Sequence, residues 1–197
     1  MVVNKKIVLA SSSQRRRVLL KQIGLTFDVV ESNIAEVFDE QKSVQENVQQ
    51  LAYQKAESVA SSIENAIVIG ADTVVVLDRK VLGKPKDAND ARRMLMNLSG
   101  KTHEVYTGFC LLDRPTNKTV SDVEITKVKF RLLGDKEIDD YIKSGSPMDK
   151  AGAYGIQDDY GAVFVERIEG CFYNVVGFPL SKFYLTMQKF QKQLGLI

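Results

Sequence analysis

AIVIGADTVVVL, residues Ala66 to Leu77, is the most apolar stretch of the chain and decides its fold class. Its length and its β-branched residues predict a central buried strand, either continuous or divided into two near Gly70. Asp72 lies in the middle of this run. A carboxylate there cannot stay ionised in a dry interior without a cation or several donors. Asp72 therefore either caps a strand break, or binds a metal ion, or takes up a proton.

The residues before this strand alternate between strand and helix patterns. Lys6–Ala10 (KIVLA) predicts a buried strand, Arg15–Ile23 a helix that ends at Gly24, and Phe27–Glu31 a second short strand. Ser43 and Glu46 have capping-box spacing and open a long helix that ends near Ile63. This alternation, without any repeat of 20 to 50 residues, indicates an α/β fold.

Lys55 falls inside the apolar stripe of the long helix, where Leu51, Ala52, Ala56 and Val59 recur at steps of three and four residues. An ammonium group at such a position is costly unless its stem reaches out to water or its charge meets an anion. The sequence is compatible with both outcomes for Lys55, access to water or pairing with an anion.

The second half of the chain predicts an antiparallel hairpin and several helices. In order, we expect a helix capped by Asp87 that ends at Gly100, strands at Glu104–Leu112 and Val120–Leu132, a charged helix at Gly134–Ser144, a glycine-rich loop, a strand at Ala162–Ile168 and a last helix after Pro179. The apolar stripe of that last helix indicates core or a subunit interface rather than a cofactor pocket.

Composition limits the classes of protein that fit. The 197 residues are enough for one domain, or two intimate lobes, with a full core. A net charge of +2 gives no global field toward nucleic acid or anionic membrane, so any anion site must be local. The chain is 44% apolar and 26% charged, which excludes a disordered or a disulfide-scaffold protein. Cys110 and Cys171 show no metal or redox spacing and are expected to be reduced thiols.

The amino-terminal residues do not have the pattern of a secretory signal. Two lysines are followed by only four apolar residues, which is too short for the apolar part of a signal peptide. Other apolar runs are interrupted within about ten residues, below the roughly 18 needed to span a bilayer. We therefore expect a cytoplasmic protein with no membrane partner.

A second candidate site is the run SSSQRRR, residues 11–17, placed between a strand end and a helix start. Amide groups at a helix amino terminus, hydroxyls and guanidinium groups all bind phosphate oxygens. The alternative is a capped helix whose arginines face solvent. No GxxxxGK[ST] motif is present, which excludes a Walker-type nucleotide loop.

Lys84, Lys150 and Gln157 lie in loops marked by glycine or proline, where scaffolds often place functional groups. His103 is the one histidine, and we expect it to be structural or solvent-facing. Without a second histidine or a cysteine beside it, it cannot build a usual zinc site. A hard ion such as Mg²⁺, with Asp72 as ligand, is compatible with the sequence.

Taken together, these residues resemble the Maf family of nucleoside triphosphate pyrophosphatases along nearly the whole chain. The matching segments are LASSSQRRRVLL, LAYQKA, VIGADTVVV, LGKPKDANDA, LSGKTHEVYTG, DKAGAYGIQ and VVGFPL. The resemblance implies a single Maf-like domain over residues 1–197, with an elongated mixed α/β sheet, two lobes around a central cleft and a fold related to inosine triphosphate pyrophosphatases. It also implies a homodimer. The segments GADT and KAGAYGIQ resemble the branch that acts on dTTP and UTP.

The resemblance also implies roles for individual residues. Catalytic roles fall on Lys55 and Asp72, metal binding on Asp72 and Glu36, and substrate binding on Ser11, Ser13, Arg15, Arg16, Thr73, Lys84, Lys150 and Gln157. Among these, Arg15, Thr73 and Gln157 match the positions that choose the base. Two departures from the family pattern are Gln14 in place of a proline and Ala35 in place of the first of two acids.

The function implied is hydrolysis of dTTP and UTP to the nucleoside monophosphate and pyrophosphate, with Mg²⁺ or Mn²⁺ as cofactor and without a nucleic-acid partner. Phosphate transfer requires mainly positioning and charge neutralisation, which fits the cations and carboxylates found. One alternative is a nucleotide-binding regulator of cell division with little turnover, which the single acid at Glu36 keeps open. Another is a phosphatase or kinase that acts on a phosphorylated metabolite, against which the absence of kinase motifs counts.

Overall fold

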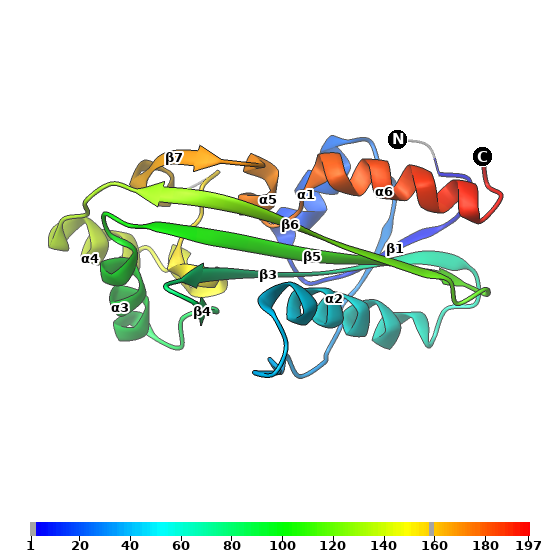
Figure 1. Cartoon of the computed structure of the whole chain (residues 1–197), viewed down its shortest axis with the longest axis horizontal. Helices are drawn as coiled ribbons and strands as arrows, with labels where there is room; N and C mark the ends of the chain where they lie inside the picture. The colour runs from blue at the N-terminus through cyan, green and yellow to red at the C-terminus, as the bar shows by residue number, and fades with distance from the viewer. Residues whose placement is uncertain (1–2, 158–159) are drawn as a thin grey trace. The chain divides into compact units, whose positions relative to one another are not determined.

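A computed structural model describes residues 3–157 and 160–197 as a mixed α/β fold (Figure 1). The strands form one sheet in the order β2-β1-β3-β5-β6-β7, and β4 pairs with β3. β1 is parallel to β2 and β3, whereas β4 is antiparallel to β3 and β7 to β6. The strands are β1 Ile7–Ala10, β2 Asp28–Val30, β3 Ala66–Leu77, β4 Lys80–Leu82, β5 Thr102–Arg114, β6 Thr119–Phe130 and β7 Val165–Glu169. The α/β class is confirmed.

Six α-helices are assigned in the described residues, and three short 3₁₀ turns lie between α4 and β7. The α-helices are α1 Gln14–Gln22, α2 Val44–Ala60, α3 Ala88–Leu98, α4 Asp135–Lys143, α5 Phe172–Val176 and α6 Leu180–Gln193. The chain forms two compact units: unit 1 contains Met1–Asp72, Thr107–Glu124 and Gly177–Ile197, and unit 2 contains Thr73–Tyr106 and Ile125–Val176. The strands β3, β5 and β6 contribute residues to both units.

In unit 1, α2 and α6 cover opposite faces of the sheet. A Cβ atom built on Gly108 of β5 would lie 2.6 Å from the backbone of Val48 in α2. The next residue, Phe109, packs its ring against Phe183 of α6, with centroids 5.8 Å apart. Because successive residues of a strand point to opposite faces, the two helices enclose the sheet between them (Figure 1).

The helix α2 approaches β3 so closely that only glycine fits at the crossing. A Cβ on Gly70 would lie 2.0 Å from the carbonyl oxygen of Ala52 and 2.8 Å from the amide nitrogen of Ala56. Both alanines are fully buried, so helix backbone lies directly on strand backbone. Of the two alternatives predicted for this stretch, the continuous strand is confirmed, because β3 runs without a break across Gly70. The role of Gly70 is to admit the helix.

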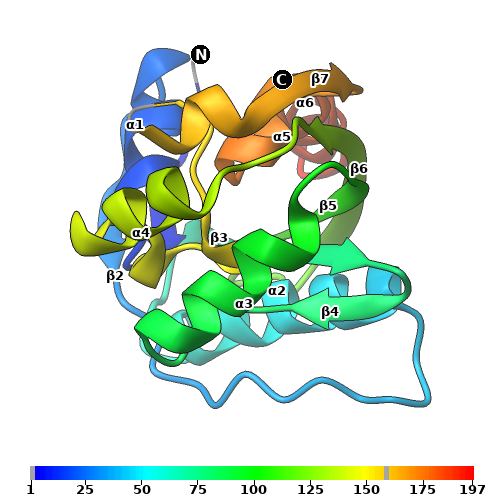
Figure 2. The same ribbon diagram turned by 90° about the vertical axis from the view of Figure 1, so that its left-hand side faces the viewer.

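Residues 31–43 connect β2 to α2 without helix or strand and form the extended blue trace of Figure 2. The predicted capping box ends this coil. The Ser43 amide donates to Glu46 Oε2 at 2.8 Å, and the Glu46 amide donates to Ser43 Oγ at 3.2 Å. The start of α2 is thereby fixed at Val44.

In unit 2, α3 and α4 lie side by side near the viewer in Figure 2. Arg92 of α3 joins the two helices, because it donates to Asp135 at 2.8 Å and to Asp139. Beneath them a buried cluster contains aromatic residues from strand, helix and loop: His103, Phe130, Tyr141, Tyr154 and Phe164. Edge-to-face packing of these rings gives unit 2 a core of its own.

Most of the elements predicted from the sequence are confirmed, with shifts of a few residues at their ends. The strand predicted at Ala162–Ile168 is wrong in its first part, because Tyr160–Phe164 form a 3₁₀ turn and β7 begins at Val165. That turn buries the Phe164 ring against Tyr141, with centroids 5.1 Å apart. The short elements β4 and α5 were not predicted. In the last helix, Tyr184 is exposed, so it does not belong to the buried stripe.

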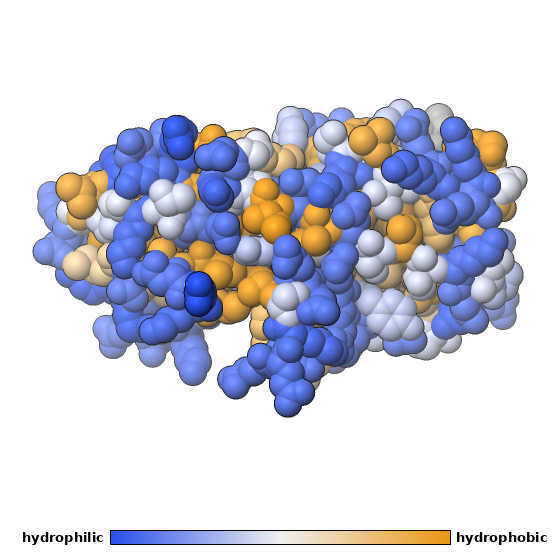
Figure 3. Space-filling model, viewed as in Figure 1, coloured by the Kyte–Doolittle hydropathy of each residue, from blue (hydrophilic) through white to orange (hydrophobic). Residues whose placement is uncertain are grey.

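Hydrophilic residues cover most of the face drawn in Figure 3, with apolar residues scattered between them. This agrees with a chain in which a quarter of the residues are charged. Among the described residues, none of the helices has the length and hydropathy needed to cross a bilayer.

The crossing at Gly70 gives a test of the fold. Gly70→Ala would push α2 away from β3, and overpacking against backbone atoms is expected to lower the free energy of unfolding by about 3 kcal/mol. Gly83→Ala is the matched control, because a Cβ there meets no atom within 4 Å. Chemical denaturation of both variants measures the difference. Equal stabilities would mean that α2 does not press on β3 at this point.

Candidate active site

The turn between β1 and α1 is built from serine hydroxyls. Ser13 caps α1 and accepts a hydrogen bond from the Arg16 amide at 3.4 Å. Ser11 is buried, and its Oγ accepts from the Ser13 amide at 3.1 Å and from Arg16 Nη1 at 3.4 Å. The helix start that the sequence placed after this serine run is confirmed, with Ser13 as its cap.

Arg16 is buried and binds protein carbonyl groups. Its Nη1 donates to the carbonyl oxygen of Ala71 at 2.9 Å, and its Nε donates to that of Gly177 at 3.1 Å. Burial lowers the pKa of the Arg16 guanidinium, while the negative charge of Asp72 acts in the opposite direction. Arg16 therefore ties the start of α1 to the peptide that precedes Asp72. The sequence predicted a cation here, but not these carbonyl partners.

The centre of unit 1 is an ammonium group between two carboxylates. Lys55 Nζ lies 2.6 Å from Asp72 Oδ1 and 2.6 Å from Glu36 Oε1. The side chains of Lys55 and Asp72 are only 10% and 8% exposed, whereas that of Glu36 is 51% exposed. Lys55 therefore meets an anion rather than reaching out to water, and the buried charge of Asp72 has its cation.

The close crossing of α2 and β3 explains this contact. Gly70 and Asp72 are two residues apart on β3 and so point to the same face of the sheet. On α2, Lys55 lies between Ala52 and Ala56, the two residues whose backbone touches Gly70. A longer helix-to-strand distance would leave the ammonium out of hydrogen-bond reach of Asp72.

This group of charges suits a hard, oxygen-ligated cation. Glu36 and Asp72 direct carboxylate oxygens at one point, and Glu36 opens the group to solvent. Within residues 3–157 and 160–197, no three His, Cys, Asp or Glu side chains gather as metal ligands. An ion held by one or two carboxylates, with phosphate oxygens and water around it, is the usual arrangement for Mg²⁺. The residues present fit such an ion.

Four of the predicted site residues belong to unit 2. Thr73 is half-buried on β3, and Lys84 is exposed just after β4. Lys150 is engaged within its own loop: its Nζ donates to the Ser146 carbonyl at 2.5 Å and to Asp149 at 2.9 Å. Binding of phosphate by Lys150 would require exchange of these contacts for the ligand.

Gln157 presents a buried amide oxygen. Its Oε1 has no hydrogen-bond partner among the residues that the structure describes. A buried acceptor left unpaired costs about 1–3 kcal/mol, so such an atom is a candidate for binding a ligand donor.

The loop that carries Lys150 and Gln157 is anchored in unit 2 at several points. The Gly152 amide donates to the Gly83 carbonyl at 3.0 Å, next to Lys84. Tyr154 Oη lies 2.8 Å from His103 Nε2. His103 is 1% exposed, and burial lowers its pKa to about 4. The structural interpretation of His103 is confirmed.

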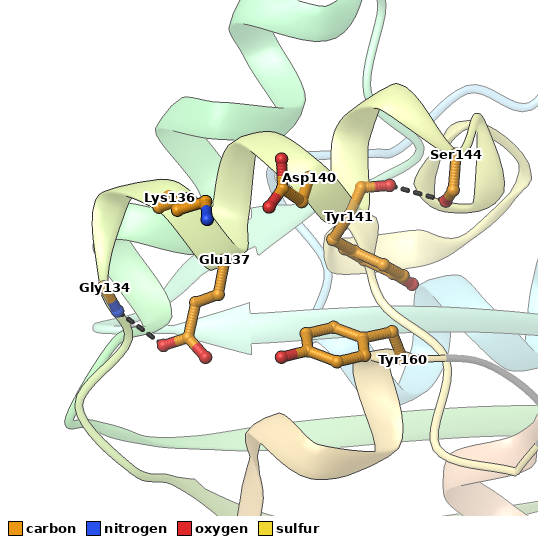
Figure 4. A pocket seen from close by; sticks show the side chains of 7 residues that line it. All are labelled: Gly134, Lys136, Glu137, Asp140, Tyr141, Ser144 and Tyr160. Atoms are coloured by element: carbon orange, nitrogen blue, oxygen red, sulfur yellow. Dashed lines mark hydrogen bonds between the residues drawn. The ribbon is translucent and has the colours of Figure 1, made fainter.

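A separate surface pocket in unit 2 contains none of the predicted site residues (Figure 4). It is lined by Gly134, Lys136, Glu137, Asp140, Tyr141, Ser144 and Tyr160. The Glu137 carboxylate of this pocket is bonded within the protein, because it accepts a hydrogen bond from the Gly134 amide and forms an ion pair with Arg131.

Comparison with known proteins gives a consistent set of relatives. The family model described as "Maf-like protein" matches residues 6–190. A "dTTP/UTP pyrophosphatase" of Acetivibrio thermocellus is 55% identical over 184 residues, covering 90% of this chain and 91% of the relative. Relatives of the same name from Thermoanaerobacter sp. and Bacillus cytotoxicus are 53% and 48% identical, covering 93% and 94% of this chain and 96% of each relative. Among solved structures, a nucleoside-triphosphatase (dITP/XTP pyrophosphatase) from Mycobacterium abscessus is similar at 13% identity and a TM-score of 0.46, covering 93% of this chain and 94% of that chain.

The buried histidine gives a pH-dependent prediction. Between pH 6.5 and about 4 the unfolded chain binds a proton at His103 that the folded chain does not. The free energy of unfolding should therefore fall as the pH falls through this window, by about 3 kcal/mol at its lower end. Because the chain has one histidine, its imidazole signals in an NMR titration need no assignment. An inflection near pH 6.5 in the folded protein would contradict a buried neutral imidazole.

Proposed function

Because the chain belongs to the Maf family, we propose that it hydrolyses dTTP and UTP to the nucleoside monophosphate and pyrophosphate. The observation that supports this most directly is the group of Lys55, Asp72 and Glu36, with contacts of 2.6 Å around a single ammonium. Cleavage of a phosphoric anhydride by water requires a positioned base, cations for the phosphate charge and little covalent chemistry by the protein. In this group Asp72 is a carboxylate that can act as the base, and Lys55 is a cation.

Asp72 is the proposed base. Its buried carboxylate can accept a hydrogen bond from a water molecule and take the proton of that water during attack. Lys55 fixes the orientation of Asp72 through the 2.6 Å contact and contributes positive charge against the phosphate chain. Arg16 fixes the preceding peptide through the Ala71 carbonyl, which keeps the Asp72 backbone in place.

Asp72 and Glu36 are the proposed ligands of Mg²⁺ or Mn²⁺. The bound ion would supply charge neutralisation at the phosphate oxygens. Lys55 Nζ lies 2.6 Å from an oxygen of each carboxylate, so the two side chains point in a common direction. With Ala35 beside Glu36, the coil offers one carboxylate at this point rather than two.

The remaining residues are proposed to bind the nucleotide. Ser11 and Ser13, with Arg15, Arg16, Lys84 and Lys150, provide hydroxyl and cationic donors suited to phosphate oxygens. Thr73 and Gln157, with Arg15, are the proposed readers of the base. The unpaired Oε1 of Gln157 supports this, because a uracil or thymine ring offers an N–H donor that such an acceptor can bind.

We place the enzyme in the cytoplasm as a homodimer, without a nucleic-acid partner. The two free cysteines, Cys110 and Cys171, support the first part of this proposal. The resemblance to the family supports the dimer, and the net charge of +2 supports the absence of a nucleic-acid partner.

The function is tested by measuring both phosphorus products separately, with dTTP, UTP, CTP and GTP in the presence of Mg²⁺. We expect one pyrophosphate for each nucleoside monophosphate, no orthophosphate, and turnover of dTTP and UTP at least about tenfold above that of GTP, the effect of one lost hydrogen bond in a polar site. Addition of a chelator is the control and should abolish the reaction.

Two outcomes would contradict the proposal. Orthophosphate together with a nucleoside diphosphate would identify a phosphatase. Nucleotide binding with no turnover in either Mg²⁺ or Mn²⁺ would identify a regulatory protein.

A further inference from the structure

Glu36 belongs to a coil that has no regular structure to hold it. Residues 31–43 form neither helix nor strand, and the Glu36 side chain is half exposed. Solvent reaches the Glu36 end of its ion pair with Lys55, and ion pairs open to water contribute about 0–1 kcal/mol. Further contacts must therefore help to hold the coil. Near its start the Ser58 hydroxyl lies 3.2 Å from that of Ser32, and near its end there is a buried interaction.

The amide of Asn47 is that interaction. Asn47 lies in the first turns of α2 and is 3% exposed. Its Oδ1 accepts from the Asp39 amide at 2.8 Å, and its Nδ2 donates to the Asp39 carbonyl at 2.9 Å. This two-point pairing fixes the backbone of Asp39, three residues after Glu36.

The same Nδ2 group closes the turn that leads into the helix. It lies 3.3 Å from the Lys42 carbonyl and 3.0 Å from the Ser43 carbonyl. A buried amide with this many backbone partners has one orientation open to it. Asparagine is a poor helix former, so local propensity does not account for its place in α2.

We propose that Asn47 is a positioning residue that holds Glu36 in reach of the metal-binding group. The link runs from the Asn47 amide through the Asp39 backbone and along three residues of coil to Glu36. This inference rests on the proposed function, in which Glu36 is a metal ligand. It adds a residue that touches neither substrate nor metal and that sets the affinity for the ion.

The test is a pair of substitutions in two backgrounds. Asn47→Ala removes the pairing with Asp39, and we expect the dissociation constant for Mn²⁺, measured by electron paramagnetic resonance of the free ion, to rise about tenfold. The Mg²⁺ concentration that gives half-maximal pyrophosphate release should rise by the same factor, while kcat at saturating Mg²⁺ changes by less than about twofold. In a Glu36→Gln background, Asn47→Ala should have no further effect on Mn²⁺ binding.

Gln50→Ala is the matched control, because it also removes a bond between the coil and α2, from Lys42 Nζ to Gln50 Oε1 at 2.6 Å. That bond is exposed, and Mn²⁺ binding should not change without it. If Asn47→Ala does not fold, Asn47→Asp replaces it. The aspartate keeps the acceptor for the Asp39 amide but cannot donate to the carbonyl, so the same loss of Mn²⁺ affinity is expected.

The outcomes separate this inference from the proposed function. Weaker Mn²⁺ binding in Glu36→Gln but not in Asn47→Ala would overturn the role of Asn47 and leave the function intact. An equal loss from Asn47→Ala in both backgrounds would also overturn it, because Asn47 would then act through another group. No loss in Glu36→Gln would overturn both the positioning role and the assignment of Glu36 as a metal ligand, whereas pyrophosphate release would still identify the reaction.

Discussion

The site depends on one steric constraint, the contact between the backbone of α2 and Gly70 of β3. Any side chain at position 70 would collide with the Ala52 carbonyl, and a helix moved outward would withdraw Lys55 from Asp72. Because alanines on the helix and glycine on the strand let the two backbones approach closely, the Lys55 ammonium lies 2.6 Å from the Asp72 carboxylate. The apolar core and the charged centre of unit 1 are consequences of the same crossing.

Charge burial at this centre does not favour the fold. Lys55 pairs with Asp72, Arg16 is buried against the carbonyl of the preceding Ala71, and desolvation of such charged groups costs several kcal/mol for each ion. Apolar residues of similar volume would give equal or greater stability. The proposed function gives this group a purpose other than stability, because the same charges would act on the phosphate chain and the attacking water.

Much of this arrangement was predictable from the sequence, because a charge inside an apolar pattern needs a partner wherever the chain folds. From the sequence, Lys55 in the α2 stripe needed either an anion or access to water, and Asp72 in the Ala66–Leu77 run needed a cation, several donors or a proton. In the structure each is the other's partner. Sequence patterns likewise predicted every α-helix except α5, and the β5–β6 hairpin. The family resemblance implied a metal-binding role for Glu36 and identified the candidate phosphate-binding residues.

Other features depend on which segments meet in space, and a pattern along the chain does not contain that information. A strand break at Gly70 stayed open as an alternative because the helix that crosses it could not be identified from the sequence. The carbonyl partners of Arg16 come from β3 and from Gly177, the residue after α5, far away in sequence. Asn47 looked like any polar helix residue, and the aromatic contacts that turn Tyr160–Phe164 into a 3₁₀ segment involve distant rings.

The central claim, that the carboxylate held by Lys55 performs the chemistry, is tested most directly by kcat for pyrophosphate release in Asp72→Asn. The amide keeps the shape of the side chain and removes its charge and basicity. We expect kcat of the Asp72→Asn protein to fall by about two orders of magnitude or more, the scale of a lost general base. Circular dichroism checks that the variant is still folded. A folded Asp72→Asn protein with kcat within about threefold of the original would contradict the central claim.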